Sequence, residues 1–225
     1  MKAMILAAGR GERLRPITDT LPKPLIHVGK YRLIEWHIHH LALAGINEII
    51  INLSHLGDMI RKELGNGNNY GVTIHYSQEP EPALETAGGI VQALELLGPE
   101  PFMVVNGDIW TDYPFTQIQL PPKLAHLVMV DNPTHHPQGD FILQGSQLVT
   151  HGQGQRYTFS GIAVYRPEFF ADCKPGRLPL APLLKKAIDA GQLTGEYYAG
   201  HWYDIGTEQR LRVMREFVVN QQGDQ

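Results

Sequence analysis

The stretch Met4-Ile-Leu-Ala-Ala-Gly-Arg-Gly-Glu-Arg-Leu-Arg-Pro-Ile-Thr18 runs from an apolar segment directly into a loop rich in glycine and arginine. Its first part, Met4 to Ala8, is a short apolar run that ends at Gly9, which favours a buried strand. Two glycines after a strand let the backbone approach a ligand closely, and successive N–H groups in such a turn can bind an anion. The stretch therefore predicts a strand followed by an anion-binding loop.

Beyond a long loop over residues 9–30, strand and helix patterns alternate up to about residue 110. The predicted strands are 48–53, 72–76 and 102–105, and the predicted helices are 31–44, 56–64 and 86–97, the last with Thr86 as its N-cap. Such alternation indicates a parallel sheet with helices on both faces. Ligands bind beyond the carboxyl ends of strands in these sheets, so we expect Gly9 and Asp108 to share one crevice.

The second half has a less regular pattern. It predicts strands over 127–130, 141–143, 147–149 and 157–165 and helices over 180–190 and 207–220. The chain contains neither an internal repeat nor a linker long enough to mark a boundary. We therefore expect residues 1–225 to form one domain.

Composition excludes several classes of protein. The 225 residues are 43% hydrophobic and 19% charged, which is typical of a globular chain. A single cysteine, Cys173, cannot form an intrachain disulfide, and no apolar run approaches the ~18–20 residues of a membrane span. The apolar start is too short for a signal peptide. These features predict a cytoplasmic protein without membrane contact.

Positive charge is concentrated at the amino terminus. Seven basic and two acidic side chains occupy residues 1–32, a net charge of +5, which leaves −9 for the rest of a chain whose total is −4. This distribution indicates either a local anion site or a solvated basic loop. No basic face with interleaved aromatic residues occurs elsewhere, so we do not expect nucleic acid as a partner.

Three cations follow the glycine turn: Arg13, Arg15 and Lys23. Pro22 and Pro24 restrict the backbone on both sides of the lysine, which suits a charge aimed at one target. The segment lacks a G-x-x-x-x-G-K-[ST] phosphate loop. The third glycine of the dinucleotide-binding pattern would fall at Leu14, so a nicotinamide-dependent enzyme is disfavoured.

Residues 6–18 and 22–24 match L-A-A-G-x-G-x-R-L-x-P-x-T and P-K-P, and in this they resemble the sugar-1-phosphate nucleotidylyltransferases. The resemblance continues through Asn106-Gly-Asp108 and Trp202-Tyr-Asp-Ile-Gly-Thr207, so it covers almost the whole chain. It implies a three-layer α/β fold with a mixed, mainly parallel sheet, the Rossmann-like nucleotidyltransferase fold. It also implies a nucleotide-binding half over about 1–120 and a sugar-binding half over about 121–225.

The family reaction joins a nucleoside triphosphate to a sugar 1-phosphate and releases pyrophosphate. By this resemblance the loop at Ala8, Gly9 and Gly11 binds the triphosphate, Arg13 contacts the leaving phosphates, and Lys23 contacts the α-phosphate and the sugar phosphate. The catalytic set is then Lys23, Arg13 and Asp108. The metal ligands are Asp108 and Asp204, which hold Mg²⁺ together with phosphate oxygens. Without the resemblance, each aspartate could equally be a turn or cap residue, and Thr207 could simply cap the helix that follows it.

The resemblance also suggests where the base and the sugar bind. Gln78 is similar in position to the family glutamine that pairs with a pyrimidine, and Gly88 would let the base approach a helix start, although Glu85 stands where the family has glycine. The E-K-P motif of many relatives is absent from the second half. Candidate sugar-binding residues are Asn106, Gly139, Asp140 and Ser160. Two loop histidines, His135 and His136, either contact a carboxylate or phosphate or simply face water.

Within the family, the short length, the Glu-Thr-Ala-Gly-Gly variant and the His-His-Pro-Gln-Gly-Asp-Phe stretch are most similar to the bacterial N-acetylmuramate α-1-phosphate uridylyltransferases of peptidoglycan recycling. The expected activity is transfer of UMP from UTP to that sugar phosphate. Alternatives are a mannose- or glucose-1-phosphate nucleotidylyltransferase and a non-catalytic subunit that senses nucleotide-sugars. A glycosyltransferase would need a D-x-D motif, which Gly107-Asp-Ile-Trp110 does not supply. The expected partners are small molecules, and the sequence does not indicate an oligomeric state.

Overall fold

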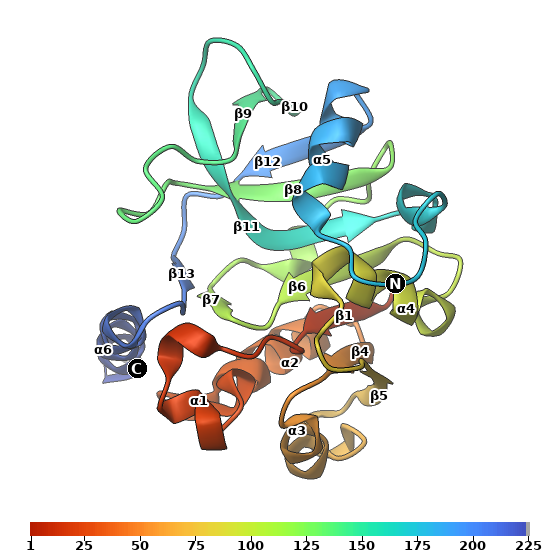
Figure 1. Ribbon diagram of the computed structural model, residues 1–225. Helices are drawn as coiled ribbons and strands as arrows, with labels where there is room; N and C mark the ends of the chain where they lie inside the picture. Colours follow the sequence, from red (N-terminus) through yellow and green to blue (C-terminus); the bar gives the residue numbers. More distant parts are fainter. Residues whose placement is uncertain (224–225) are drawn as a thin grey trace.

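The computed structural model describes residues 1–223, and nine strands within them form one mixed sheet (Figure 1). The predicted alternation of the first half is confirmed, with element ends shifted by at most three residues. Its principal elements are β1 (Ala3–Leu6), α2 (Leu33–Leu43), β4 (Glu48–Leu53), α3 (Gly57–Leu64), β5 (Thr73–Gln78), α4 (Glu85–Leu97) and β6 (Phe102–Asn106).

In the second half the predicted strands and helices are also present, and three short strands were not predicted. The confirmed elements are β8 (Ala125–Val130), β9 (Phe141–Gln144), β10 (Gln147–Val149), β11 (Arg156–Tyr165), α5 (Leu180–Asp189) and α6 (Glu208–Gly223). The additional strands are β7 (Ile109–Thr111), β12 (Leu193–Tyr197) and β13 (Trp202–Asp204). They are short and their apolar patterns are weak, so pairing with neighbouring strands defines them more than local sequence does.

The strand order in the main sheet is β5-β4-β1-β6-β11-β8-β12-β10-β9. The first four strands are parallel, and β1 pairs in register with both neighbours, Ile5 opposite Ile51 and Val105. β11 then runs antiparallel to both β6 and β8, while β12 is parallel to β8. The sheet thus extends without interruption from the first half into the second, as a mixed, Rossmann-like α/β architecture.

Helices cover both faces of the sheet and make three layers. Ile5 points into a core that contains Ile38 of α2 and Ile60 of α3, whereas the adjacent Met4 points into a core that contains Ile90 of α4. This alternation follows from the period of two along a strand. Because both faces of β1 are buried, its sequence is continuously apolar.

The segment predicted as a loop over residues 9–30 contains short ordered pieces. They are two 3-10 turns, Glu12–Leu14 and Lys23–Leu25, the single-turn α1 (Ile17–Thr20), and a two-residue strand pair formed by β2 (His27–Val28) and β3 (Tyr31–Arg32). Further 3-10 turns lie at Asn68–Tyr70, Phe115–Gln117 and Pro167–Phe170. The first loop packs on α6 through a third apolar cluster, which consists of Leu14, Ile26, Val28, Leu33, Trp110, Ile205, Leu211, Met214 and Val218.

Thr86 is not the N-cap of α4, so that prediction was wrong. The helix begins one residue earlier, after Leu84, and no side chain caps it. The backbone N–H of Leu84 instead donates to the Glu79 carboxylate at 2.8 Å, which fixes the chain where the helix starts. Over the described residues, no helix combines the length and the apolar character that spanning a membrane requires.

Candidate functional site

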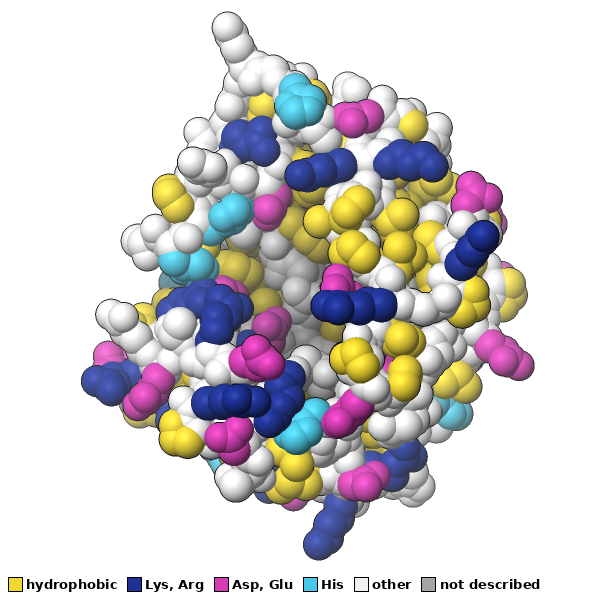
Figure 2. Space-filling model, viewed as in Figure 1, with side chains coloured by type: hydrophobic (Ala, Val, Ile, Leu, Met, Phe, Trp, Pro, Cys, Tyr) yellow, Lys and Arg dark blue, Asp and Glu magenta, His cyan; other side chains and the backbone are white. Residues whose placement is uncertain are grey.

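A cavity of about 550 Å³ opens where four parallel strands end. Its wall is formed by the carboxyl end of β4, the segments that follow β1, β5 and β6, and the start of α4, together with one residue that precedes α6. The lining residues are Leu6, Ala7, Ala8, Gly9, Gly11, Glu12, Arg13, Leu14, Lys23, Pro24, Asn52, Glu79, Ala83, Glu85, Thr86, Asn106, Gly107, Asp108 and Gly206. Figure 2 shows the hollow in the middle of one face, bordered by Lys and Arg side chains. The predicted shared crevice of Gly9 and Asp108 is therefore present.

The glycine loop forms one wall of this cavity. Gly11 has φ +69°, and a Cβ there would lie 2.9 Å from Cγ2 of Thr18, so both backbone conformation and space require glycine. Thr18 in turn donates its hydroxyl to the Gly11 carbonyl at 2.8 Å. A Cβ added to Gly9 would meet no atom within 4 Å. Thr18 thus supports the loop at Gly11, while Gly9 leaves open space on the loop, which suits close approach by a ligand.

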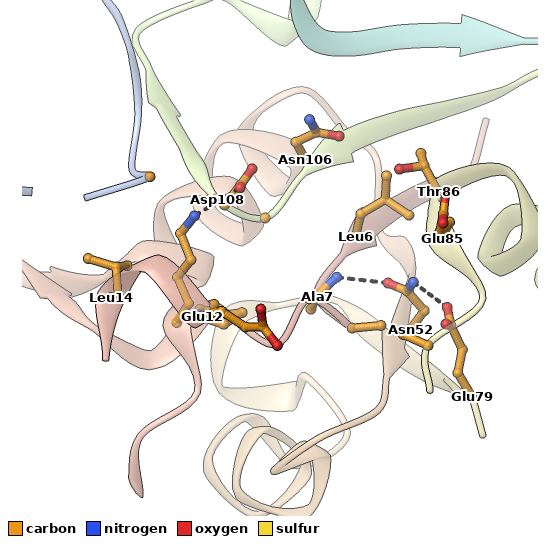
Figure 3. A pocket seen from close by; sticks show the side chains of 18 of the residues that line it. Leu6, Ala7, Glu12, Leu14, Asn52, Glu79, Glu85, Thr86, Asn106 and Asp108 are labelled. Atoms are coloured by element: carbon orange, nitrogen blue, oxygen red, sulfur yellow. Dashed lines mark hydrogen bonds and ion pairs between the residues drawn. The ribbon is translucent and has the colours of Figure 1, made fainter. Parts of the chain in front are cut away.

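Lys23 and Asp108 form an ion pair in the cavity wall, with Nζ and Oδ2 2.9 Å apart (Figure 3). The lysine belongs to the 3-10 turn that follows Pro22, and 9% of its side chain is exposed, compared with 47% for Asp108. Burial of the lysine stem restricts its rotamers and aims the ammonium at the cavity. Here the structure joins two predicted site residues that are 85 positions apart in sequence.

Three hydrogen bonds to the backbone of residues 107–109 hold Asp108 in place. The N–H of Gly107 donates to the Leu6 carbonyl at 2.9 Å, and a Cβ at Gly107 would lie only 2.5 Å from that oxygen. The N–H of Ile205 donates to the Asp108 carbonyl at 2.9 Å. On the next residue, the Ile109 carbonyl lies 2.9 Å from Nε2 of His37. The tight turn at Asn106-Gly-Asp108 therefore presents the Asp108 carboxylate at the end of β6.

His37 is a buried support of this turn. Burial lowers its pKa to about 4, and the positive field of His40 acts in the same direction. A neutral imidazole that donates from Nε2 to the Ile109 carbonyl accounts for this contact. His37 and His40, three positions apart, thus belong to the packing of α2 beneath β7.

Asp204 lies beside Asp108 but does not line the cavity. β13 pairs antiparallel with β7, which places Asp204 opposite Ile109. The Asp204 carboxylate contacts Nη1 of Arg210 through Oδ2, and its Oδ1 lies 3.1 Å from Nε2 of His135. Asp108 thus lies in the turn before β7 and Asp204 at the end of the neighbouring β13, and both oxygens of Asp204 are engaged by side chains.

Two cavity residues that sequence reasoning missed link the glycine loop to the start of α4. Asn52 accepts a hydrogen bond from the Ala7 N–H at 2.8 Å and donates to Glu79 at 2.6 Å (Figure 3). The other oxygen of Glu79 accepts from the Leu84 N–H. Both side chains belong to residues only 3% exposed. In the sequence, Asn52 could have been recognised as a candidate because it is a polar residue within the largely apolar strand Glu48–Leu53.

Gln78 and Gly88 do not line the cavity. Gln78 is exposed, and its main-chain carbonyl accepts from Gln92 at 2.6 Å, while the next residue, Glu79, turns inward. Gly88 packs against the segment that precedes α5, where a Cβ would overlap the Gly176 carbonyl and lie 3.1 Å from the Leu178 nitrogen. The glycine is thus explained by helix–loop packing.

Of the four candidate sugar residues, Asn106 alone lines the main cavity. Gly139 lines a separate cavity of about 530 Å³ near Asn132. Asp140 accepts the Phe159 N–H at 2.8 Å. Ser160 is fully buried and donates to the Val128 carbonyl at 2.7 Å, where the pairing of β11 with β8 is irregular. The latter two side chains organise the backbone of the second half.

The predicted phosphate-site residues do meet: Ala8, Gly9, Gly11, Arg13 and Lys23 line the same cavity. Glu85, also in the wall, has φ +62° and pairs with Nε of Arg177 at 2.8 Å. Of the two loop histidines, His135 contacts Asp204, and His136 lies 3.2 Å from the Asp140 carboxylate. Both side chains are more than a third exposed and contact carboxylates of the protein itself, so these contacts do not decide whether either histidine binds a ligand.

Comparisons with known proteins agree with this site. The family described as Nucleotidyl transferase matches residues 2–120. An N-acetylmuramate alpha-1-phosphate uridylyltransferase of Neisseria meningitidis is 50% identical, with 94% of this chain and 96% of the relative aligned. A protein of the same name from Caulobacter vibrioides is 31% identical, with 92% of each chain aligned. A mannose-1-phosphate guanyltransferase of Aspergillus fumigatus is 43% identical, and the alignment spans 92% of this chain and 61% of that protein.

Among solved structures, a Bacillus anthracis protein described as a glucose-1-phosphate thymidylyltransferase, in complex with sucrose, superposes with a TM-score of 0.86. The superposition covers 98% of this chain and 96% of that one at 24% identity, so it supports the fold. The family match covers the glycine loop, the Lys23 turn and Asp108, which are the parts that meet at the cavity. On the combined evidence of family match, aligned relatives and fold, this chain belongs to the nucleotidyl transferase family.

Proposed function

We propose that this protein transfers UMP from UTP to N-acetylmuramate α-1-phosphate, giving the UDP-sugar and pyrophosphate, as a step in the recycling of peptidoglycan sugars. The observation that carries the proposal is the Lys23–Asp108 pair in the wall of a cavity whose other side is the glycine loop. The two uridylyltransferase relatives, aligned over nearly their whole length, support the choice of substrates.

The reaction brings two anions together, so positive charge and positioning are its main requirements. A sugar phosphate oxygen attacks the α-phosphorus, the bond between that phosphorus and the bridging oxygen to the β-phosphate breaks, and pyrophosphate leaves. In this proposal Lys23 contacts the α-phosphate and the incoming phosphate, and Arg13 contacts the leaving group. A phosphate monoester is already an anion near pH 7, so no general base is needed.

Mg²⁺ fits the donor set at this site, because a carboxylate in the turn before β7 and one at the end of the neighbouring β13, together with phosphate oxygens, match its preference. Asp108 and Asp204 would hold the ion. Bound there, it would offset phosphate charge. The contacts of Asp204 with Arg210 and His135 would have to open for its oxygens to serve as ligands.

The wall formed by Asn52, Glu79, Glu85 and Thr86 is the proposed base site, in place of Gln78. In Figure 3 this wall and Asp108 lie on opposite sides of Ala7, where the glycine loop begins. A nucleotide whose phosphates follow the glycine loop toward Asp108 would have its base at this wall. Asn106 lies on the opposite side of the cavity, toward the second half, and is the proposed contact to the sugar.

The test is a matrix of UTP, dTTP, GTP and ATP against the 1-phosphates of N-acetylmuramate, N-acetylglucosamine, mannose and glucose, with pyrophosphate release as the readout. UTP with N-acetylmuramate 1-phosphate is expected to have the highest kcat/KM. A higher value for GTP with mannose 1-phosphate would replace the proposed substrates. Nucleotide-sugar binding without pyrophosphate release in any combination would indicate a sensing subunit, and release of a nucleoside diphosphate would indicate glycosyl transfer.

A further inference from the structure

Two guanidinium groups meet at Gly206, in the wall of the main cavity. A Cβ at this position would overlap Nη2 of Arg210 and lie 3.2 Å from Cζ of Arg13. Arg13 comes from the 3-10 turn after the glycine loop and Arg210 from the first turn of α6. The bare Cα of Gly206 is therefore what allows both cations to approach the same point.

Their charges are only partly compensated within the described residues. Arg210 pairs with the Asp204 carboxylate, and its Nη1 lies 2.6 Å from Nε2 of His135. Arg13 has neither an ion pair nor a hydrogen bond to any described residue. The two guanidinium groups near Gly206 repel each other unless an anion binds between them. The unpaired charge of Arg13 therefore favours an anionic ligand at this point.

The position of the pair indicates which anion it receives. Arg13 and Lys23 line one cavity, so a triphosphate whose α-phosphate lies at Lys23 can extend its outer phosphates toward Arg13. Arg210 lies beside Arg13 at Gly206, and Gly206 is a lining residue of this cavity. The planar fork of arginine suits bidentate contact with phosphate oxygens. A triphosphate bound in this way would bring its β- and γ-phosphates toward two guanidinium groups.

We infer that Arg210 contacts the leaving pyrophosphate together with Arg13, after exchanging its contact with Asp204 for phosphate oxygens. The inference rests on the proposed function, since it assigns a residue to that reaction's product. Until the phosphates bind, Asp204 and His135 hold the guanidinium of Arg210, whose side chain is 20% exposed. Both arginines would then stabilise the negative charge that develops on the leaving pyrophosphate.

The test compares Arg210→Gln and Arg210→Lys with the matched control Arg212→Gln, whose side chain is 71% exposed on the same helix. In the reverse reaction, with Mg²⁺, the glutamine variant is expected to raise the KM for pyrophosphate by about 10- to 100-fold, as expected for loss of hydrogen bonds to a charged group. The lysine variant should raise the KM for pyrophosphate less, because it keeps the positive charge but loses the bidentate geometry of the guanidinium. The KM for the UDP-sugar should stay within about 2-fold of wild type in all variants.

Calorimetric titration of each folded protein with pyrophosphate and Mg²⁺ measures the same contact without turnover. Weaker pyrophosphate binding by Arg210→Gln than by wild type and Arg212→Gln, with Arg210→Lys in between, would support the inference. Unchanged pyrophosphate affinity in that variant, or a loss confined to thermal stability, would show that Arg210 only braces Asp204 and would overturn it. Failure of the proposed function is a separate result: the wild type would bind pyrophosphate yet release none from any substrate pair.

Discussion

Lys23 is the residue on which the proposed chemistry depends most directly. Its ammonium is the buried partner in the pair with Asp108, whose carboxylate is about half exposed. Lys23→Ala removes a positioned charge from a phosphoryl-transfer site, so kcat should fall by about 10²–10³-fold. Circular dichroism should remain that of a folded protein, because solvent can hydrate Asp108 in the variant. Pyrophosphate release measures the change, with the exposed Lys62→Ala as control, and an unchanged kcat would remove Lys23 from the mechanism.

The two carboxylates allow a second prediction at this scale. Asp108→Asn and Asp204→Asn keep side-chain shape but remove negative charge, so each should lower turnover by at least about 10²-fold and raise the Mg²⁺ concentration needed for half-maximal rate. Titration of activity against Mg²⁺ measures both effects, and Asp58→Asn on an exposed face of α3 is the control. Full activity of a folded Asp204→Asn variant would exclude this residue from the metal site.

At the scale of elements, the start of α4 contains a strained residue. Glu85 has φ +62°, where a non-glycine side chain costs about 1 kcal/mol, and its ion pair with Arg177 is exposed. Glu85→Gly should therefore be more stable than Glu85→Ala by about 1 kcal/mol, the reverse of the usual order in helices. Urea unfolding of both variants measures the difference. Equal stability, or a more stable alanine variant, would contradict a left-handed backbone at this position.

The contact of α2 with β7 predicts a pH dependence of stability. Burial lowers the pKa of His37 from 6.5, its ordinary value, to about 4 in the folded protein. Between these two pH values His37 is protonated in the unfolded chain and neutral in the folded one. The free energy of unfolding should thus fall as pH falls from 6.5 to 4, by on the order of 3 kcal/mol from this group.

His37→Gln should flatten that slope, since glutamine can donate to the Ile109 carbonyl without gaining charge. Urea unfolding at pH 7 and pH 4.5 measures the slope, and the exposed His151→Gln is the control. A variant slope equal to that of wild type would show that His37 does not titrate in this range.

At the scale of the whole molecule, one ligand would connect segments from both ends of the chain. The cavity takes its wall from the end of β4, from loops after β1, β5 and β6, and from Gly206 before α6. A ligand that binds only the folded state stabilises it by about 2.7 kcal/mol at 100 times its Kd. UTP with Mg²⁺ at that concentration should raise the melting temperature by about 5–10 °C. Differential scanning calorimetry measures the shift, and Lys23→Ala at the same UTP concentration should show a smaller one.

The half of the fold made of alternating strands and helices was predictable because each pattern is local. A run such as Glu48–Leu53 must be a buried strand wherever it lies, and right-handed crossovers then place its end beside Gly9 and Asp108. The strands β7, β12 and β13 could not be predicted in the same way. They contain three to five residues each, and they exist because a neighbouring strand supplies their hydrogen bonds.

Sequence alone determined the glycine loop, its cations and the turn at Asp108, because steric demands on glycine and proline act within a few residues of chain. Tertiary structure decided which polar groups line the cavity, Glu79 rather than Gln78 and Asn52 near the end of an apolar strand, and it brought Arg210 of the last helix to Gly206 in the cavity wall. The direction of a side chain at the end of a strand depends on pairing register. The approach of Arg210 to Arg13 depends on where α6 packs, and no pattern within either segment specifies that distance.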